Sequence, residues 1–212
     1  MMSFDLSLYL VTDRSLSKGR EIEWIVEQAV KGGVTMVQLR EKSCTTREFV
    51  NLAIRLKKKL QHVNVPLIIN DRLDIVLASD ADGLHIGQGD MPYNIARRIL
   101  GYGKIIGLSV ENMEQAHQAN SMDVDYIGIS PVYSTDTKTD THVPFELEGI
   151  RQVMSFTNHP AVAIGGIGPS NAAHIIDAGA NGIAVVSAIV SSPDPESAAK
   201  KLKSIVSEHL KQ

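Results

Sequence analysis

Short apolar runs alternate with amphipathic stretches along the whole chain. Leu8–Val11 and Met36–Leu39 are too short for helices and are bounded by polar or turn residues, so each predicts a buried strand. Between them, apolar residues at 22–30 recur at helical spacing, and Gly32 and Gly33 end that helix. The same alternation predicts further strands at 67–69, 83–86, 104–108, 125–129, 161–164 and 183–186, each followed by a helix.

Eight strand–helix pairs in 212 residues, with no linker or low-complexity segment between them, predict the fold class. They match a minimal α/β fold, a (β/α)₈ TIM barrel, formed by residues 1–212 as a single domain. The rival is an open doubly wound sheet, which requires a G-x-G-x-x-G turn after the first strand. Thr12, Asp13 and Arg14 stand there instead, so the sequence favours the barrel.

Composition and charge exclude several classes of protein. Apolar residues make up 43 % and charged residues 21 % of the chain, as in ordinary globular proteins. The net charge is −3 without a long basic run, so we expect no nucleic-acid partner. The single Cys44 fits a reducing compartment, and neither a signal peptide nor a membrane span is evident, so we expect a cytoplasmic enzyme. The sequence leaves open whether the protein forms a homo-oligomer.

Polar side chains stand at every other position at the end of the second strand and just beyond it. Gln38, Arg40 and Lys42 point the same way because strand side chains have period two. Two cations and an amide suit a polyanionic ligand. The alternative is that Arg40 and Lys42 pair with nearby acids such as Glu41, but unpaired charge next to a buried strand favours the ligand.

Carboxylates follow the third and fourth strands. Asp71 and Asp90 would meet at the carboxyl ends of the strands, where barrels bind ligands, and could hold one Mg²⁺ together with phosphate oxygens and water. The alternative is that both are helix N-caps. Asn70 could reach phosphate, as could Ser109 after the fifth strand, although Ser109 could equally cap the next helix. His85 lies inside a strand and is expected to be a satisfied interior histidine.

Two further features suit phosphate. The one long loop, 130–146, carries Thr135, Thr137 and Lys138, which fit closure over phosphates as well as an ordinary solvated loop. The turn at Gly165 and Gly166 and the residue Ser187 follow strands seven and eight, where barrels often bind a phosphate monoester with backbone N–H groups. Glycine would also serve a tight turn there, and the two readings are compatible.

One face would therefore hold a diphosphate beside a monophosphate, which suggests group transfer with diphosphate as leaving group. The residues that carry this reading also resemble a known family, the thiamine-phosphate synthases. The resemblance lies in five blocks along nearly the whole chain: VQLREK at 37–42, INDRLDIVLASDADGLHIGQGDMP at 69–92, TDTK at 135–138, AIGGI at 163–167 and AVVSAI at 184–189.

The resemblance implies a transferase on a (β/α)₈ barrel that joins a pyrimidine diphosphate to a thiazole phosphate with Mg²⁺. Gln38 matches the residue that contacts the pyrimidine, and Asp71 and Asp90 match the metal ligands. Residues that match those around the diphosphate are Arg40, Lys42, Asn70, Ser109 and Lys138, and all of these except Asn70 are expected to be catalytic. Mg²⁺, Arg40 and Lys138 would neutralise the leaving group. Residues that match the thiazole phosphate site are Thr135, Thr137, Gly166, Ser187 and Ile189.

The chain departs from the family pattern around the long loop. Ser130 stands within the usual G-x-G-P block, Ser134 replaces a proline, and Glu146 replaces a glycine. These departures leave open a non-catalytic barrel that binds a thiamine precursor. A second alternative is a related thiazole tautomerase on the same barrel, which needs neither Mg²⁺ nor a diphosphate site. Retention of Arg40, Lys42 and both aspartates favours the synthase.

Overall fold

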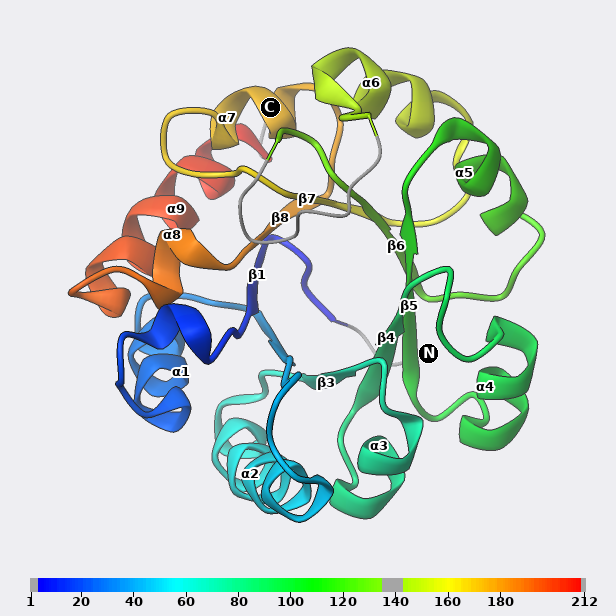
Figure 1. Cartoon of the computed structure of the whole chain (residues 1–212). Helices are drawn as coiled ribbons and strands as arrows, with labels where there is room; N and C mark the ends of the chain where they lie inside the picture. Colours follow the sequence, from blue (N-terminus) through cyan, green and yellow to red (C-terminus); the bar gives the residue numbers. More distant parts are fainter. Residues whose placement is uncertain (1–3, 135–142, 211–212) are drawn as a thin grey trace.

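The eight predicted strands form one closed parallel barrel, with the strands in chain order (Figure 1). The computed structural model describes residues 4–134 and 143–210. Leu10 on β1 lies opposite Val37 on β2 and Val185 on β8, so the last strand closes onto the first. The strands are β1 Leu8–Val11, β2 Met36–Leu39, β3 Leu67–Asn70, β4 Gly83–Ile86, β5 Ile105–Val110, β6 Tyr126–Ile129, β7 Ala161–Ile164 and β8 Gly182–Val185. The barrel prediction is confirmed, with strand ends shifted by a residue or two.

Helices surround the barrel, and each predicted one is present. They are α1 Ile22–Lys31, α2 Thr46–Leu60, α3 Leu73–Ser79, α4 Tyr93–Leu100, α5 Met113–Ala119, α6 Glu146–Phe156, α7 Ala172–Asp177 and α9 Pro195–His209. The capping box that starts α2 is formed by Thr45 and Glu48. Pro92 is the N-cap of α4, directly before its first residue, Tyr93. None of the helices in the described ranges is long and apolar enough to cross a membrane.

Three short elements are absent from the sequence prediction. They are α8, Ser187–Val190, between β8 and α9, and the 3₁₀ turns Ser15–Ser17 and Gln61–Val63. Each is too short to show an apolar period, which explains why the pattern does not predict it. Of the three, α8 matters for function because Ser187, which begins it, lies at the carboxyl end of the barrel.

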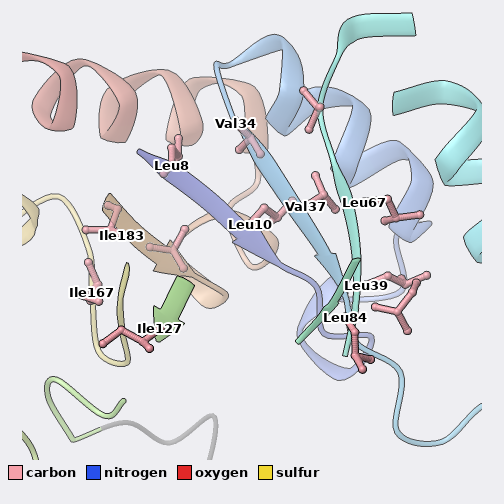
Figure 2. Packing of buried hydrophobic residues seen from close by; sticks show 14 of the residues in the cluster. Leu8, Leu10, Val34, Val37, Leu39, Leu67, Leu84, Ile127, Ile167 and Ile183 are labelled. Atoms are coloured by element: carbon pink, nitrogen blue, oxygen red, sulfur yellow. The ribbon is translucent and has the colours of Figure 1, made fainter. Parts of the chain in front are cut away.

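Alternation along the strands builds two separate apolar layers. Leu8 and Leu10 belong to the larger layer, between the strands and the helices, whereas Tyr9 and Val11 belong to the smaller layer. Figure 2 shows part of the larger layer, in which Leu10, Val37 and Leu67 come from three successive strands. The smaller layer fills the barrel interior and includes two fully buried tyrosines, Tyr9 and Tyr126. The interior therefore combines aliphatic packing with phenolic hydroxyls.

A repeated hydrogen-bonded ring ties the amino ends of the strands together in pairs. Asp82, directly before β4, donates its backbone N–H to the Leu67 carbonyl at 2.9 Å. Its Oδ2 accepts from the Leu67 N–H at 2.8 Å and so satisfies the first N–H of β3. The same two bonds join three further pairs: Thr35 to Leu8, Asp125 to Ile106 and Asn181 to Ala161. One ring therefore closes each of the strand pairs β1–β2, β3–β4, β5–β6 and β7–β8.

Glu146, at the start of α6, has a backbone φ of +50°, in the left-handed region that favours glycine. This is the position where the related family usually has glycine. The backbone of this turn therefore follows the geometry that a glycine would adopt, and the glutamate bears the steric cost of its Cβ.

Candidate active site

A cavity of about 500 Å³ opens at the carboxyl ends of the barrel strands. Most of the predicted site residues line it, although they come from six different strand ends. They are Gln38, Arg40, Lys42, Asn70, Asp71, Asp90, Ser109, Gly166 and Ser187. Thr135, Thr137 and Lys138 lie outside the described residues. Ile189 is fully buried within α8 and is not part of the cavity wall. Its role in binding stays a prediction.

Both predicted cations of β2 have carboxylate partners from neighbouring strand ends. Arg40 Nη1 lies 2.7 Å from Asp13 Oδ2, and the Lys42 ammonium contacts Asp71. The alternative that both cations pair with nearby acids is therefore confirmed, and the assumption that their charge is unpaired is wrong. Only the suggested partner differs, because Glu41 forms a bidentate pair with Arg14 at 2.7 and 3.0 Å. Asp13 also accepts from the Ser15 N–H at 2.9 Å, which holds its carboxylate in place. The guanidinium of Arg40 is thereby oriented at the cavity wall.

The two aspartates are not helix caps. The N-cap of α3 is Arg72 and that of α4 is Pro92, so the capping alternative is wrong for both Asp71 and Asp90. Asp90 Oδ2 instead accepts from the Gly87 N–H at 2.7 Å, within the loop after β4. Burial raises the pKa of Asp90, and the adjacent Asp71 carboxylate raises it further. The two carboxylates are therefore close enough to interact.

This donor set fits a cation that brings other ligands with it. Among the described residues, no group of three or more His, Cys, Asp and Glu side chains could hold a metal ion. Mg²⁺ characteristically takes one or two carboxylates plus phosphate oxygens and water. Asp71 and Asp90 are thus suited to Mg²⁺ that arrives with a phosphorylated substrate, and Lys42 partly neutralises Asp71.

Ser109 is joined to a polar chain that crosses the barrel interior. His85 Nε2 lies 2.8 Å from Ser109 Oγ, and His85 Nδ1 lies 2.9 Å from the Tyr126 hydroxyl. The Tyr126 hydroxyl lies 2.9 Å from that of Tyr9, which accepts from Gln38 Nε2 at 2.9 Å. His85 is therefore the satisfied interior histidine that the sequence predicts. Ser109 does not cap α5, whose N-cap is Asn112.

The loops after β7 and β8 provide the other side of the cavity. Gly165 and Gly166 have φ values of +104° and +66°, so the turn requires glycine for its backbone angles. A Cβ on Gly166 would lie 2.8 Å from the Tyr133 Cβ and 3.1 Å from the Ser134 carbonyl oxygen. Both explanations offered for these glycines, the tight turn and close approach to a ligand, are thus compatible with the structure.

Sequence reasoning missed the residues that contact the predicted site residues, directly or through one another, and hold them in place. Asp13 lies two residues past the end of β1, and that position was a usable signal. Tyr9 and Tyr126 lie inside apolar runs, where they count as apolar, so no local signal marks their hydroxyls as a connected pair.

Comparisons with known proteins agree with the fold and identify a family. A family described as thiamine monophosphate synthase matches residues 8–189. The chain is 51 % identical over 205 residues to a thiamine-phosphate synthase of Syntrophomonas wolfei, covering 97 % of this chain and 98 % of that protein. It is 46 % identical over 203 residues to the Chloroflexus aurantiacus thiamine-phosphate synthase, covering 96 % and 94 %.

A solved structure gives the same result. The thiamine phosphate pyrophosphorylase from Pyrococcus furiosus superposes with a TM-score of 0.89 at 36 % identity, covering 97 % of each chain. The family match spans most of the chain, and the relatives match over almost their full lengths. The chain therefore belongs to the thiamine monophosphate synthase family.

Proposed function

We propose that the protein is a thiamine-phosphate synthase. It would join 4-amino-2-methyl-5-hydroxymethylpyrimidine diphosphate to 4-methyl-5-(2-phosphoethyl)thiazole and release diphosphate. One observation carries the proposal: residues from six strand ends, selected from the sequence as two anion sites, line a single cavity. The relatives that match over nearly the full chain bear that name.

The diphosphate would occupy the side of the cavity formed by β2 to β5. Arg40 and Lys42 supply positive charge there, and both already sit against carboxylates that orient them. Asn70 and Ser109 add neutral donors on the same wall. These groups stabilise the charge that develops on diphosphate as the C–O bond breaks, which is where electrostatic stabilisation is most effective.

The metal belongs to the same side. Asp71 and Asp90 would hold Mg²⁺, which when bound would neutralise charge on the leaving diphosphate. Lys42 contacts Asp71 and Gly87 donates to Asp90, so both carboxylates have a neighbour that fixes their direction.

The second substrate would bind opposite, on the loops after β7 and β8. Gly166 and Ser187 line the cavity there, with Ser187 at the start of α8, and their backbone would approach the thiazole phosphate closely. Once diphosphate leaves, the thiazole nitrogen forms the new bond to the exocyclic carbon of the pyrimidine. The protein positions both partners and excludes water, which can supply much of the acceleration. Thr135, Thr137, Lys138 and Ile189 complete this proposal from the sequence alone, with Ile189 inside α8, two residues beyond Ser187.

Partners and compartment form part of the same proposal. The protein would act in the cytoplasm on two small molecules, without nucleic acid or a membrane. The net charge of −3 and the single cysteine support this assignment. Self-association stays a prediction, and light scattering of the purified protein measures it.

The test is product formation from the two named substrates with Mg²⁺. We expect thiamine phosphate and diphosphate in equal amounts, and loss of both products in excess chelator. Interconversion of a thiazole carboxylate phosphate without Mg²⁺ would instead identify a tautomerase. Binding of either substrate without any product would identify a non-catalytic barrel.

A matched pair of variants ties the activity to the cavity. Arg40→Gln removes a charge from the cavity wall, whereas Arg55→Gln removes one from an exposed ion pair with Glu23 on the outer helices. We expect a large loss of turnover for the first and none for the second. Equal turnover in both variants would show that the diphosphate does not bind beside Arg40.

A further inference from the structure

The polar chain in the barrel interior links Gln38, Tyr9, Tyr126, His85 and Ser109, and of these only Ser109 is not buried. Tyr9 and Tyr126 are fully buried, and Gln38 and His85 are each 3 % exposed. Burial raises the pKa of both tyrosines, so each phenol keeps its single proton. A neutral hydroxyl donates one hydrogen bond and accepts others. The donor and acceptor in each hydrogen bond of the chain are therefore fixed by the donor and acceptor in the bond before it.

In the observed geometry the bonds run from Gln38 to Ser109. Gln38 Nε2 has no lone pair and donates to the Tyr9 oxygen, so the Tyr9 proton is turned towards Tyr126. The Tyr126 proton then goes to His85 Nδ1. A neutral imidazole with Nδ1 as acceptor carries its proton on Nε2, which donates to Ser109 Oγ. The Ser109 proton is thereby left for the cavity.

The hydrogen bonds can also run in the opposite direction, with one donor and one acceptor still paired in each bond. If the Gln38 amide turns over, its oxygen accepts from Tyr9, and every bond along the chain reverses. Ser109 then donates to His85 and presents only lone pairs to the cavity. An anion prefers the first arrangement, because it needs a donor from Ser109.

At the other end of the chain, the orientation of the Gln38 side-chain amide depends on a different group of the ligand. Gln38 lines the cavity, and with its Nε2 bonded to Tyr9 its side-chain oxygen stays available as an acceptor, because no described residue donates to it. An N–H on a heteroaromatic amine can donate to that oxygen. Such an amine therefore selects the same direction of the chain that an anion at Ser109 selects.

We propose that Tyr9, Tyr126 and His85 are positioning residues that couple the two ends of the cavity, so that an amine bound at Gln38 turns the Ser109 proton towards a diphosphate. This inference rests on the proposed function for the identity of the two ligands. Because coupling between two sites is reciprocal, diphosphate also strengthens binding of the amine.

The barrel is built to hold this chain. Gly107 on β5 lies between Tyr126 and His85 in the strand register, and a Cβ there would overlap the Tyr126 ring. A Cβ on Gly128 would lie 3.3 Å from the His85 ring. Two glycines thus leave the space in which the histidine and the tyrosine meet.

The experiment measures diphosphate affinity by calorimetry in the presence of Mg²⁺. Titrations with inorganic diphosphate are made alone, with saturating 4-amino-2,5-dimethylpyrimidine, and with 2,5-dimethylpyrimidine, which lacks the amine. We expect the amine to tighten diphosphate binding at least about fivefold in the wild type, the lower end of usual coupling. The pyrimidine without the amine leaves the affinity unchanged.

Tyr126→Phe breaks the chain and should reduce the coupling to less than about twofold, even where diphosphate alone still binds. Tyr93→Phe is the matched control, because its hydroxyl accepts from the Asp123 N–H outside the barrel, at 2.6 Å. It should keep the full coupling. If Tyr126→Phe does not fold, Tyr9→Phe breaks the chain at the other phenol and should give the same loss.

Coupling of wild-type size in a folded Tyr126→Phe or Tyr9→Phe variant, or no coupling in the wild type, overturns the inference. The readout needs no turnover. If the wild type makes thiamine phosphate but the variants keep the full coupling, only the role of the hydrogen-bonded chain is refuted. If the wild type makes no product, the proposed function is refuted, while the titrations still decide whether the chain couples its two ends.

Discussion

Asp90→Asn separates the charge of the proposed metal site from its geometry. The Asp90 side chain holds the loop after β4 by accepting from the Gly87 N–H at 2.7 Å. An asparagine oxygen can accept the same bond, so the loop keeps its shape. What is lost is one of the two negative charges that would face Mg²⁺.

The size of the loss follows from the exposure of the site. Asp90 is half-buried, so the effective dielectric constant lies nearer 20 than 4, and unit charges about 4 Å apart interact by about 4 kcal/mol. The amide oxygen retains part of the interaction. A loss of about 3 kcal/mol is then expected, and it corresponds to about a hundredfold in turnover.

The stability of the same variant should change in the opposite direction. Since burial and Asp71 raise the pKa of Asp90 in the folded protein, its charged form destabilises the fold at neutral pH. Asp90→Asn should therefore melt at a higher temperature than the wild type in chelator at pH 7. This gain should shrink as the pH falls through the folded pKa of Asp90, because the wild-type carboxyl is then protonated.

Initial rates over a range of Mg²⁺ concentrations, together with melting curves, provide the assay. Asp80→Asn is the control, since Asp80 is an exposed aspartate paired with Lys104 away from the cavity. Turnover of Asp90→Asn within threefold of Asp80→Asn at every Mg²⁺ concentration would refute the metal assignment. A lower melting temperature for Asp90→Asn would show that the carboxylate has a structural role instead.

Three further variants test other parts of the structure. Gly166→Ala places a Cβ against Tyr133 at a φ of +66°. Calorimetry should show weaker binding of thiazole phosphate and unchanged binding of pyrimidine diphosphate, and equal losses for both ligands would mean that the sites are wrongly assigned. Glu146→Gly should stabilise the fold by about 0.5 kcal/mol in denaturant titrations, as relief of left-handed strain outweighs added chain entropy, whereas Glu146→Gln should give no gain. Lys138→Ala, a prediction from sequence alone, should lower kcat about a hundredfold with little change in KM; unchanged single-turnover rates of C–O cleavage would make Lys138 an ordinary loop residue.

The barrel could be predicted from sequence because each strand is a continuous apolar run between turn residues. A strand buried on both faces needs no alternation, and Leu8–Val11 illustrates this, with all four residues buried. α8 could not be predicted in this way, because four residues complete barely one helical turn.

The front of the candidate site could be predicted because parallel strands bring their carboxyl ends to one face. Gln38, Asp71 and Ser109 each lie at or just past a strand end, so local position alone places them on that face. The residues behind them depend on closure of the barrel. Tyr9 and Tyr126 bond to each other across 117 positions of sequence.

The strain at Glu146 shows a different limit. Comparison with the family pattern marks the position as unusual, but only the backbone angle explains why glycine is usual there. A residue type alone does not reveal the dihedral angles that it adopts.

The hydrogen-bonded rings at the amino ends of the strands bear on how the chain can be rearranged. Within the described residues, each ring joins two strands that are consecutive in the chain, so the barrel divides into four self-closing segments. A circular permutant that begins ahead of β3, β5 or β7 keeps every ring inside one segment. One that begins ahead of β2, β4, β6 or β8 sends the two halves of a ring to opposite ends of the polypeptide. Permutation in steps of two strands therefore leaves these hydrogen bonds local in sequence, whereas permutation by an odd number of strands turns one ring into a contact that spans nearly the whole chain.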